Sequence, residues 1–328
     1  MGIFSVSGAL RGTQFIATRG PRYGTLFVNT GCNRRCVYCV VPDEGSGIEL
    51  PTETWFEIID RLHSWGVRLF GILGGEPTLR KDLPEIVAYA AKRGGVNVTS
   101  NGDTFAGARG LVRLETLTGS GVKVLTLSLH QAEDLDRQLD LLVTARRLGA
   151  IPVLGVVVTR QSIGTTADVM RETNSRGILF RYCFVQSLGG VFSALDAQLQ
   201  PTPGQIEDFT SQVLKQKKRT GLIQNSDLYI KGWDLYPRSW HCDVSTDRWV
   251  VVDNEGKLMA CSEYATSVPV LSIQSLNDAR WVEERTDKRS VCAGCTYQCY
   301  IEEEGLGTKD LVREGINIGR GLLRSKPH

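Results

Sequence analysis

The side chains best suited to chemistry in this sequence are three closely spaced cysteines. Cys32, Cys36 and Cys39 form a Cx3Cx2C pattern directly after the apolar run 26–28. Three thiolates in so short a segment can ligate one cuboidal iron–sulfur cluster and leave its fourth iron without a protein ligand, whereas a closed structural site needs four ligands. The spacing therefore indicates a cluster with one iron open to chemistry, and half of a zinc site is the alternative.

The other cysteines include a second group near the C-terminus. The chain has nine cysteines in all. Beyond the first three they are Cys183, Cys242, Cys261, Cys292, Cys295 and Cys299. An odd number, largely gathered in tight groups, favours metal ligation in a reducing compartment over a disulfide framework. We therefore expect a cytoplasmic protein.

Composition and charge narrow the class of protein further. The 328 residues are 41% hydrophobic and 23% charged, which is typical of a soluble globular chain. The net charge of +2 gives no broad attraction to nucleic acid or to an anionic membrane. No apolar run approaches the roughly 18 residues of a membrane span, and arginines interrupt the segment where a signal peptide would need an apolar core. We expect neither a nucleic-acid nor a membrane partner.

Alternating strands and helices would position the first cysteine group. Predicted strands cover residues 23–29, 67–73, 96–99, 123–129, 151–158 and 178–185, and predicted helices cover 52–65, 83–93, 109–119, 133–148 and 166–175. Six strands alternating with helices predict parallel βαβ units with right-handed crossovers. The predicted fold class is α/β, a partial (β/α)6 TIM-like barrel with a small C-terminal mixed α/β cluster-binding domain.

In such a barrel the chemistry gathers at the C-terminal ends of the strands. The residues at or just after the C-terminal ends of the predicted strands are the cysteine loop, Gly74-Gly75-Glu76-Pro77, Asn101, Ser128, His130, Thr159 and Arg160. We expect these residues to meet at the mouth of the barrel.

The alternation stops after residue 185. Short strands and turns follow from residue 221, with a turn predicted at 253–256 between strands at 249–252 and 258–261. The predicted units are a lead-in at 1–22, the barrel at 23–200, a connecting helix at 201–220, the cluster-binding domain at 221–305 and a helical tail at 306–328.

The first cysteine group has the pattern of a known superfamily. With Tyr38 in the aromatic slot and Gly74-Gly75-Glu76-Pro77 after the second strand, it resembles the radical S-adenosylmethionine (SAM) superfamily over roughly residues 23–185. The resemblance implies that Cys32, Cys36 and Cys39 hold a [4Fe–4S] cluster whose open iron chelates SAM. Reductive cleavage of SAM then gives a 5′-deoxyadenosyl radical that takes hydrogen from a substrate. A flavodoxin- or ferredoxin-type electron donor is implied.

The same resemblance assigns cofactor contacts at the strand ends. Gly74 and Gly75 would let the backbone approach the methionyl amine, with Glu76 nearby and Pro77 stiffening the turn. The polar residues Asn101, Ser128 and Thr159 would lie near the ribose, carboxylate or adenine of SAM. The alternative is that all of these are ordinary turn and capping residues.

The later cysteines resemble a second cluster-binding unit. Their order, C-x13-G-x4-C followed by C-x2-C, resembles the Twitch domain, a shortened form of the SPASM extension. The resemblance implies that Cys242, Cys261, Cys292 and Cys295 hold one auxiliary [4Fe–4S] cluster. A zinc knuckle with four cysteine ligands is the rival interpretation. Cys183 and Cys299 remain as candidate donors of a hydrogen atom to a substrate radical, or as small buried residues.

The predicted function is a radical SAM oxidoreductase or isomerase acting at an unactivated C–H bond. Only 31 residues precede Cys32, which is short for a leader-peptide recognition domain. We therefore favour dehydrogenation or epimerisation of a sugar, an aminocyclitol or another small natural product. The alternative is a maturase that modifies a ribosomally made peptide. A further alternative is a non-catalytic zinc or iron–sulfur protein.

Overall fold

Six parallel strands form the barrel in this computed structural model. The structure describes residues 21–41, 47–186, 190–191, 193, 196–232, 248–292, 294–295, 297–298, 301–302, 306 and 308–325. The strands are β1 (Tyr23–Phe27), β2 (Leu69–Leu73), β3 (Gly95–Ser100), β4 (Val124–Leu129), β5 (Ile151–Val158) and β6 (Leu179–Phe184). They lie in the order β6-β5-β4-β3-β2-β1, and each neighbouring pair is parallel. This arrangement confirms the predicted partial barrel.

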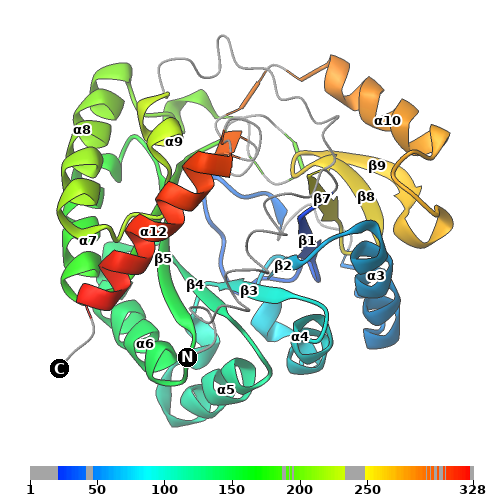
Figure 1. The fold of residues 1–328 in the computed structure, drawn as a ribbon, viewed down its shortest axis with the longest axis horizontal. Helices are drawn as coiled ribbons and strands as arrows, with labels where there is room; N and C mark the ends of the chain where they lie inside the picture. Colours follow the sequence, from blue (N-terminus) through cyan, green and yellow to red (C-terminus); the bar gives the residue numbers. More distant parts are fainter. Residues whose placement is uncertain are drawn as a thin grey trace.

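Helices cover the outer face of the barrel (Figure 1). They are α3 (Thr52–Trp65), α4 (Leu83–Ala91), α5 (Gly107–Gly119), α6 (Leu135–Arg147), α7 (Ile163–Ser175) and α8 (Pro203–Thr220). In α3 the apolar residues Trp55, Ile58, Ile59 and Leu62 lie on one buried stripe, and Gly66 ends the helix with a φ of 115°. Neither these helices nor any other helix in the described part of the chain is long and apolar enough to cross a membrane.

Each barrel strand presents its alternate residues to two different surroundings. On β5, Leu154, Val156 and Val158 belong to the core shared with the outer helices. Val153 instead belongs to a smaller cluster with Leu179 of β6. Because successive side chains of a strand point to opposite faces, this division identifies the second set as the barrel interior.

The C-terminal strands extend the same sheet past β1. β7 (Trp249–Val252) pairs in parallel with β1, and β8 (Lys257–Cys261) and β9 (Tyr264–Pro269) follow in antiparallel order, with α10 (Ala279–Ser290) outside them (Figure 1). The antiparallel pairing of β7 with β8 confirms the predicted turn at 253–256. The predicted domain boundaries stay a prediction, but β7, which lies within 221–305, hydrogen-bonds directly to β1 of the barrel.

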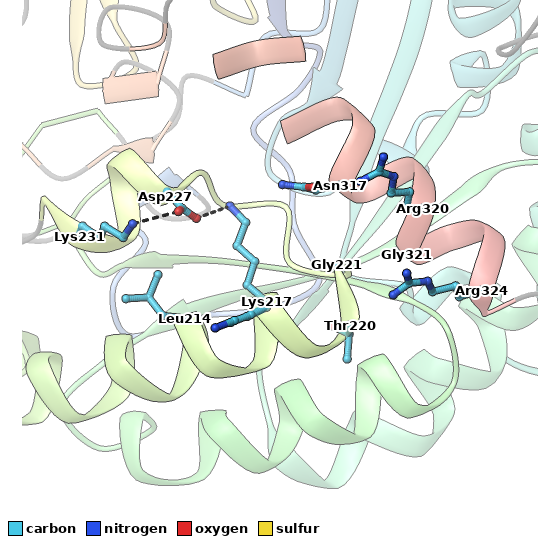
Figure 2. A pocket seen from close by; sticks show the side chains of 11 residues that line it. Leu214, Lys217, Thr220, Gly221, Asp227, Lys231, Asn317, Arg320, Gly321 and Arg324 are labelled. Carbon is cyan, nitrogen blue, oxygen red and sulfur yellow. Dashed lines mark hydrogen bonds and ion pairs between the residues drawn. The ribbon is translucent and has the colours of Figure 1, made fainter. Parts of the chain in front are cut away.

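Helix α12 (Thr308–Arg324) closes the base of the barrel interior. Its Ile318 and Leu322 pack with the cluster at the start of β4, β5 and β6. It crosses the end of α8 at two glycines, where a Cβ on Gly321 would lie 2.8 Å from the carbonyl carbon and oxygen of Gly221. Figure 2 shows this crossing beside Lys217.

A buried ion pair fixes α12 to α8. The Nζ atom of Lys217 lies 2.7 Å from Oε2 of Glu314 on α12 and 3.1 Å from Oδ1 of Asp227. Asp227 begins α9 (Asp227–Lys231), and its side chain also pairs with Lys231 (Figure 2). Lys217 therefore joins three helices, so the floor of the barrel and its outer wall form one packed unit.

The glycine crossing gives a stability prediction. Gly321→Val should lower the free energy of unfolding by about 1–3 kcal/mol, because the new side chain must push α12 away from α8. Chemical denaturation would measure the change. Gly315→Ala on the same helix is the control, since a Cβ there meets nothing within 4 Å. The control should leave stability unchanged or raise it by up to about 1 kcal/mol. Equal effects of the two variants would contradict the close crossing.

Candidate functional site

The start of the cysteine loop packs directly on the segment that follows β2. The amide of Gly75 donates to the carbonyl of Asn29 at 2.9 Å, and the amide of Glu76 donates to the carbonyl of Gly31 at 2.8 Å. A Cβ on Gly74 would lie 2.3 Å from Oδ1 of Asn29, and a Cβ on Gly75 would lie 2.3 Å from the carbonyl oxygen of Thr30. The two glycines are therefore required for this contact, a role that the sequence analysis did not assign to them.

Glu76 is a buried carboxylate that joins the ends of β2 and β3. It is 1% exposed and accepts hydrogen bonds from the amide of Asn101 at 2.7 Å, from Oγ of Ser100 at 2.8 Å and from the amide of Thr78 at 3.1 Å. Burial raises the pKa of Glu76, although these donors act in the opposite direction. The carboxylate holds Asn101 at the mouth, while direct contact of Glu76, Pro77 or Asn101 with SAM stays a prediction.

Arg34 ties the cysteine loop to the ends of β3 and β4. Its Nε and Nη2 donate to the two carboxylate oxygens of Asp103 at 2.7 and 2.6 Å, and Nη2 also reaches Asp134 at 2.8 Å. Arg137 of α6 donates to the same two carboxylates at 2.9 Å each. The bidentate fork fixes the direction as well as the position of the loop. This network was not predicted from the sequence, although both aspartates closely follow predicted strands.

The thiols of the first group lie in a partly buried environment. All three are free, and burial raises the pKa of Cys39 to about 11 and also raises the pKa of Cys32 and Cys36. Nδ1 of His130 lies 3.2 Å from Sγ of Cys36 and 2.9 Å from the hydroxyl of Tyr38. Burial lowers the pKa of His130 to about 4, so this ring is neutral near pH 7. The sequence predicted His130 at the mouth of the barrel but indicated no partner for it.

The second cysteine group is partly within the described residues. Cys261, Cys292 and Cys295 are free thiols close enough to affect one another electrostatically. Burial is the main cause that raises the pKa of Cys261 and of Cys295 to about 12. The predicted fourth ligand Cys242 and the candidate donor Cys299 both lie outside the described residues.

Glu263 lies between the two cysteine groups. Its side chain is buried and accepts hydrogen bonds from the hydroxyl of Tyr297 and from the amide of Ser193 at 3.2 Å. Ser193 in turn pairs with Cys39 in an isolated β-bridge. After burial, the charge of Glu263 is a smaller cause of the raised pKa of Cys39 and Cys295. One carboxylate therefore connects the surroundings of both groups.

The remaining predicted site residues lie along β4 to β6. Ser128 and Cys183 are half-buried, and Cys183 is near enough to Tyr38 to contribute, after burial, to that residue's raised pKa. Thr159 forms a local turn, because its amide and hydroxyl both contact Oγ of Ser162, at 2.9 and 3.2 Å. Arg160 donates to the carbonyl of Gln200 at 2.9 Å. Roles in SAM binding or hydrogen donation stay predictions for these residues.

A separate cavity lies away from the cysteines. It measures about 490 Å³ and opens between α8, α9 and α12, with Lys217, Asp227 and Arg324 among its lining residues (Figure 2). No cysteine lines it. The candidate functional site is therefore the barrel mouth, where the cysteine loop, Glu76, Asn101 and His130 meet.

The chain resembles known proteins in sequence and in fold. Residues 26–151 match the Radical SAM superfamily. A PqqA peptide cyclase of Granulibacter bethesdensis is 28% identical over 268 residues, covering 75% of this chain and 69% of the relative. A probable GTP 3',8-cyclase of Methanopyrus kandleri is 31% identical over 166 residues, covering 47% of this chain and 53% of the relative. The crystal structure of Streptococcus suis SuiB bound to S-adenosylmethionine has a TM-score of 0.64 at 15% identity, covering 92% of this chain and 80% of that chain.

The fold and the site together define an α/β barrel enzyme with a cysteine loop after its first strand. Residues 26–151 of the chain form a radical SAM domain. The cofactors of this family are a [4Fe–4S] cluster and S-adenosylmethionine, and they confirm the chemistry expected from the cysteine spacing.

The geometry of the cysteine loop fits a cluster. The amide of Arg34 points at Sγ of Cys32 over 3.4 Å, and such N–H···S contacts stabilise cluster thiolates. Among the residues that the structure describes, no three His, Cys, Asp or Glu side chains converge closely enough to hold a single metal ion. Cysteines of a cuboidal cluster each bind a different iron, so their sulfurs need not converge on one point.

The Arg34 network gives a second prediction. Arg34→Gln should lower the free energy of unfolding of the apo protein by about 1–3 kcal/mol, because Asp103 and Asp134 lose charged donors at a partly buried site. It should also lower the iron bound after reconstitution. Arg113→Gln, which removes the same charge from the exposed face of α5, is the control. If both variants unfold alike and bind equal iron, Arg34 does not hold the loop.

The same network predicts a pH dependence. Hydrogen bonds from Arg34 are the main cause that holds the pKa of Asp103 below its usual range. A carboxyl with a lowered folded pKa stabilises the protein above its unfolded pKa of about 3.9, and this contribution is lost as the pH falls through the folded value. The stability difference between wild type and Arg34→Gln should be full above about pH 5 and shrink below about pH 4. Denaturation curves across this range would measure it, and a constant difference would contradict the ion pair.

Proposed function

We propose that this radical SAM enzyme modifies a peptide. The observation that carries the proposal is the extent of the match to a PqqA peptide cyclase, which spans 268 residues and 75% of this chain. The predicted barrel alone, at 23–200, is shorter than this match. The match to the GTP 3',8-cyclase covers only 47% of the chain. The likeness to the peptide cyclase therefore reaches beyond the part common to the superfamily.

The sequence alone favoured a sugar or aminocyclitol substrate, whereas the comparisons favour the alternative, a peptide. The preference depended on the short segment before Cys32 and on the balanced charge, and neither feature identifies a substrate. A second PqqA peptide cyclase, from Bradyrhizobium diazoefficiens, is 26% identical over 281 residues and 80% of this chain. A peptide substrate is therefore the better-supported proposal.

In this proposal each part of the mouth has a defined task. A reduced cluster with bound SAM supplies a 5′-deoxyadenosyl radical for hydrogen abstraction. Cys32, Cys36 and Cys39 hold the cluster, and Arg34 and the two glycines of the segment 74–75 hold the loop that carries them. His130 contacts Cys36 and the hydroxyl of Tyr38, and these two side chains would limit the access of water to Cys36.

The second cysteine group would serve an oxidation. Cys261, Cys292 and Cys295, with Cys242 as the predicted fourth ligand, would hold an auxiliary cluster on the other side of Glu263 from Cys39. A fully ligated cluster has no iron open for SAM, so its suitable role is to accept the electron that the substrate radical gives up, while a proton leaves the substrate. The net reaction would then be an oxidative bond formation or a dehydrogenation within the peptide, and the enzyme would be an oxidoreductase.

Anaerobic reconstitution tests this proposal. The protein with SAM and dithionite should release 5′-deoxyadenosine, and short peptides encoded beside its gene should raise the rate and lose about two mass units, the mass of two hydrogen atoms, by mass spectrometry. GTP in place of the peptide is the control and should not alter the rate. If GTP alone raised the rate, the proposal of a peptide substrate would be contradicted. If the protein bound zinc in place of iron and released no 5′-deoxyadenosine, the proposal that it is a radical SAM enzyme would be contradicted.

The two cysteine groups should be separable by mutation. A variant with Cys32, Cys36 and Cys39 all changed to Ala should lose all SAM cleavage, because no open iron remains. It should still bind about four irons at the second group. Iron and sulfide counts and EPR spectra of the reduced protein measure the outcome. Loss of both clusters would argue against two separate sites.

A further inference from the structure

Arg181 is a cation that projects into the barrel interior. The neighbouring Tyr182 packs against Phe209 of α8 and Tyr229 of α9, so the outer face of β6 is occupied by that residue. Because side chains alternate along a strand, Arg181 and Cys183 face inward. A Cβ on Gly155 of β5 would lie 3.9 Å from Nη2 of Arg181. The guanidinium therefore lies beside Gly155, at ordinary van der Waals distance from where a Cβ would be.

Arg181 has no acidic partner within the described ranges. It makes no hydrogen bond or ion pair there, whereas Arg34, Arg80 and Arg137 at the strand ends all contact aspartates. It is also half-buried, and a cation that is partly removed from water needs a compensating charge or acceptor. An unpaired guanidinium in the interior is therefore a binding group whose partner is not part of the described chain.

The surroundings of Arg181 are polar but uncharged. The strand registers align Ser128 with Gly155 and Gly155 with Arg181, so all three lie at one level of the interior. One step nearer the base, Thr126 donates to Asn97 at 3.1 Å, and the apolar cluster closed by α12 forms the floor. The inward positions of β3 to β6 carry no Asp or Glu. Among these inward positions of β3 to β6, Arg181 is the cation that can recognise an anion.

We propose that Arg181 binds a carboxylate of the substrate, an Asp or Glu side chain or the C-terminus of the peptide. This inference rests on the proposed function. A guanidinium binds a carboxylate through two parallel N–H···O bonds, which fixes orientation as well as charge. The predicted SAM contacts come from the ends of β2 to β5, whereas Arg181 stands on β6 two residues from Cys183. The carboxylate would hold the substrate against the wall that carries this thiol.

A pair of matched probes tests the proposal. N-acetyl-glutamic acid α-amide and N-acetyl-glutamine α-amide differ only in a side-chain carboxylate or amide, and their binding to the reconstituted enzyme with SAM is measured by equilibrium dialysis. Wild type should prefer the glutamate probe by about tenfold or more. Arg181→Gln should lose the preference. Arg181→Lys should keep part of it, because an ammonium keeps the positive charge but cannot donate two parallel hydrogen bonds to one carboxylate.

The control variant is Arg171→Gln, which removes an arginine from the exposed face of α7 and should bind both probes as wild type does. Because Arg181 has no partner among the described residues, its replacement leaves no orphaned charge, and iron content and melting temperature should stay unchanged. If Arg181→Gln fails to fold, the Lys variant and the wild-type preference still decide the question.

Three results would overturn the proposal. The first is equal binding of the two probes to the wild-type enzyme, and the second is an unchanged preference for the glutamate probe in Arg181→Gln. The third is a tenfold or greater loss of SAM affinity in Arg181→Gln, which would show that the guanidinium binds the carboxylate of SAM. These measurements need no turnover. Failure of the proposed function would appear separately, as a wild-type enzyme that cleaves SAM without modifying any peptide.

Discussion

The site depends on one close contact between two backbones. Residues 29–31, which lead into the cysteine loop, lie so near Gly74 and Gly75 that any side chain there would collide with carbonyl oxygens. The contact sets where the loop leaves β1 relative to the end of β2, and the amides of Gly75 and Glu76 complete it. Glu76 links the segment after β2 to the end of β3 by accepting a hydrogen bond from the amide of Asn101. Arg34 links the cysteine loop to the segment after β4 by donating to Asp134. The loop is thus held by three neighbouring strands.

Charge is used differently at the mouth and in the interior. Arg34 and Arg137 share Asp103 and Asp134, so each partly buried charge at the strand ends is compensated within the chain. Such compensation stabilises a fixed geometry. Arg181 lacks a partner in the described residues and leaves the interior with a charge to be matched by a bound group. The first arrangement is structural and the second is suited to recognition.

Much of the architecture follows from local pattern. The six strands and their order could be predicted because each apolar run is followed by a helical period and a turn signal. The predicted helices match the observed ones closely, as 52–65 does for α3, while α5 and α7 begin two or three residues before their predicted starts at 109 and 166. The position of β7 against β1 could not be predicted. In this pair Thr25 lies opposite Val251. These residues are far apart along the chain, and a local sequence pattern does not predict such a pairing.

The sequence by itself determined the chemistry that this protein can perform, because three cysteines at Cx3Cx2C spacing are close along the chain whatever the fold. It also determined the parallel barrel, because hydrophobic period is a local property. Only the tertiary structure decided which side chains hold the loop, what closes the interior and which cation is left unpaired. Arg34 and Asp134 are 100 residues apart, and Glu76 and Asn101 are 25 apart. Such contacts depend on how the strands are brought together, which spacing along the chain does not record.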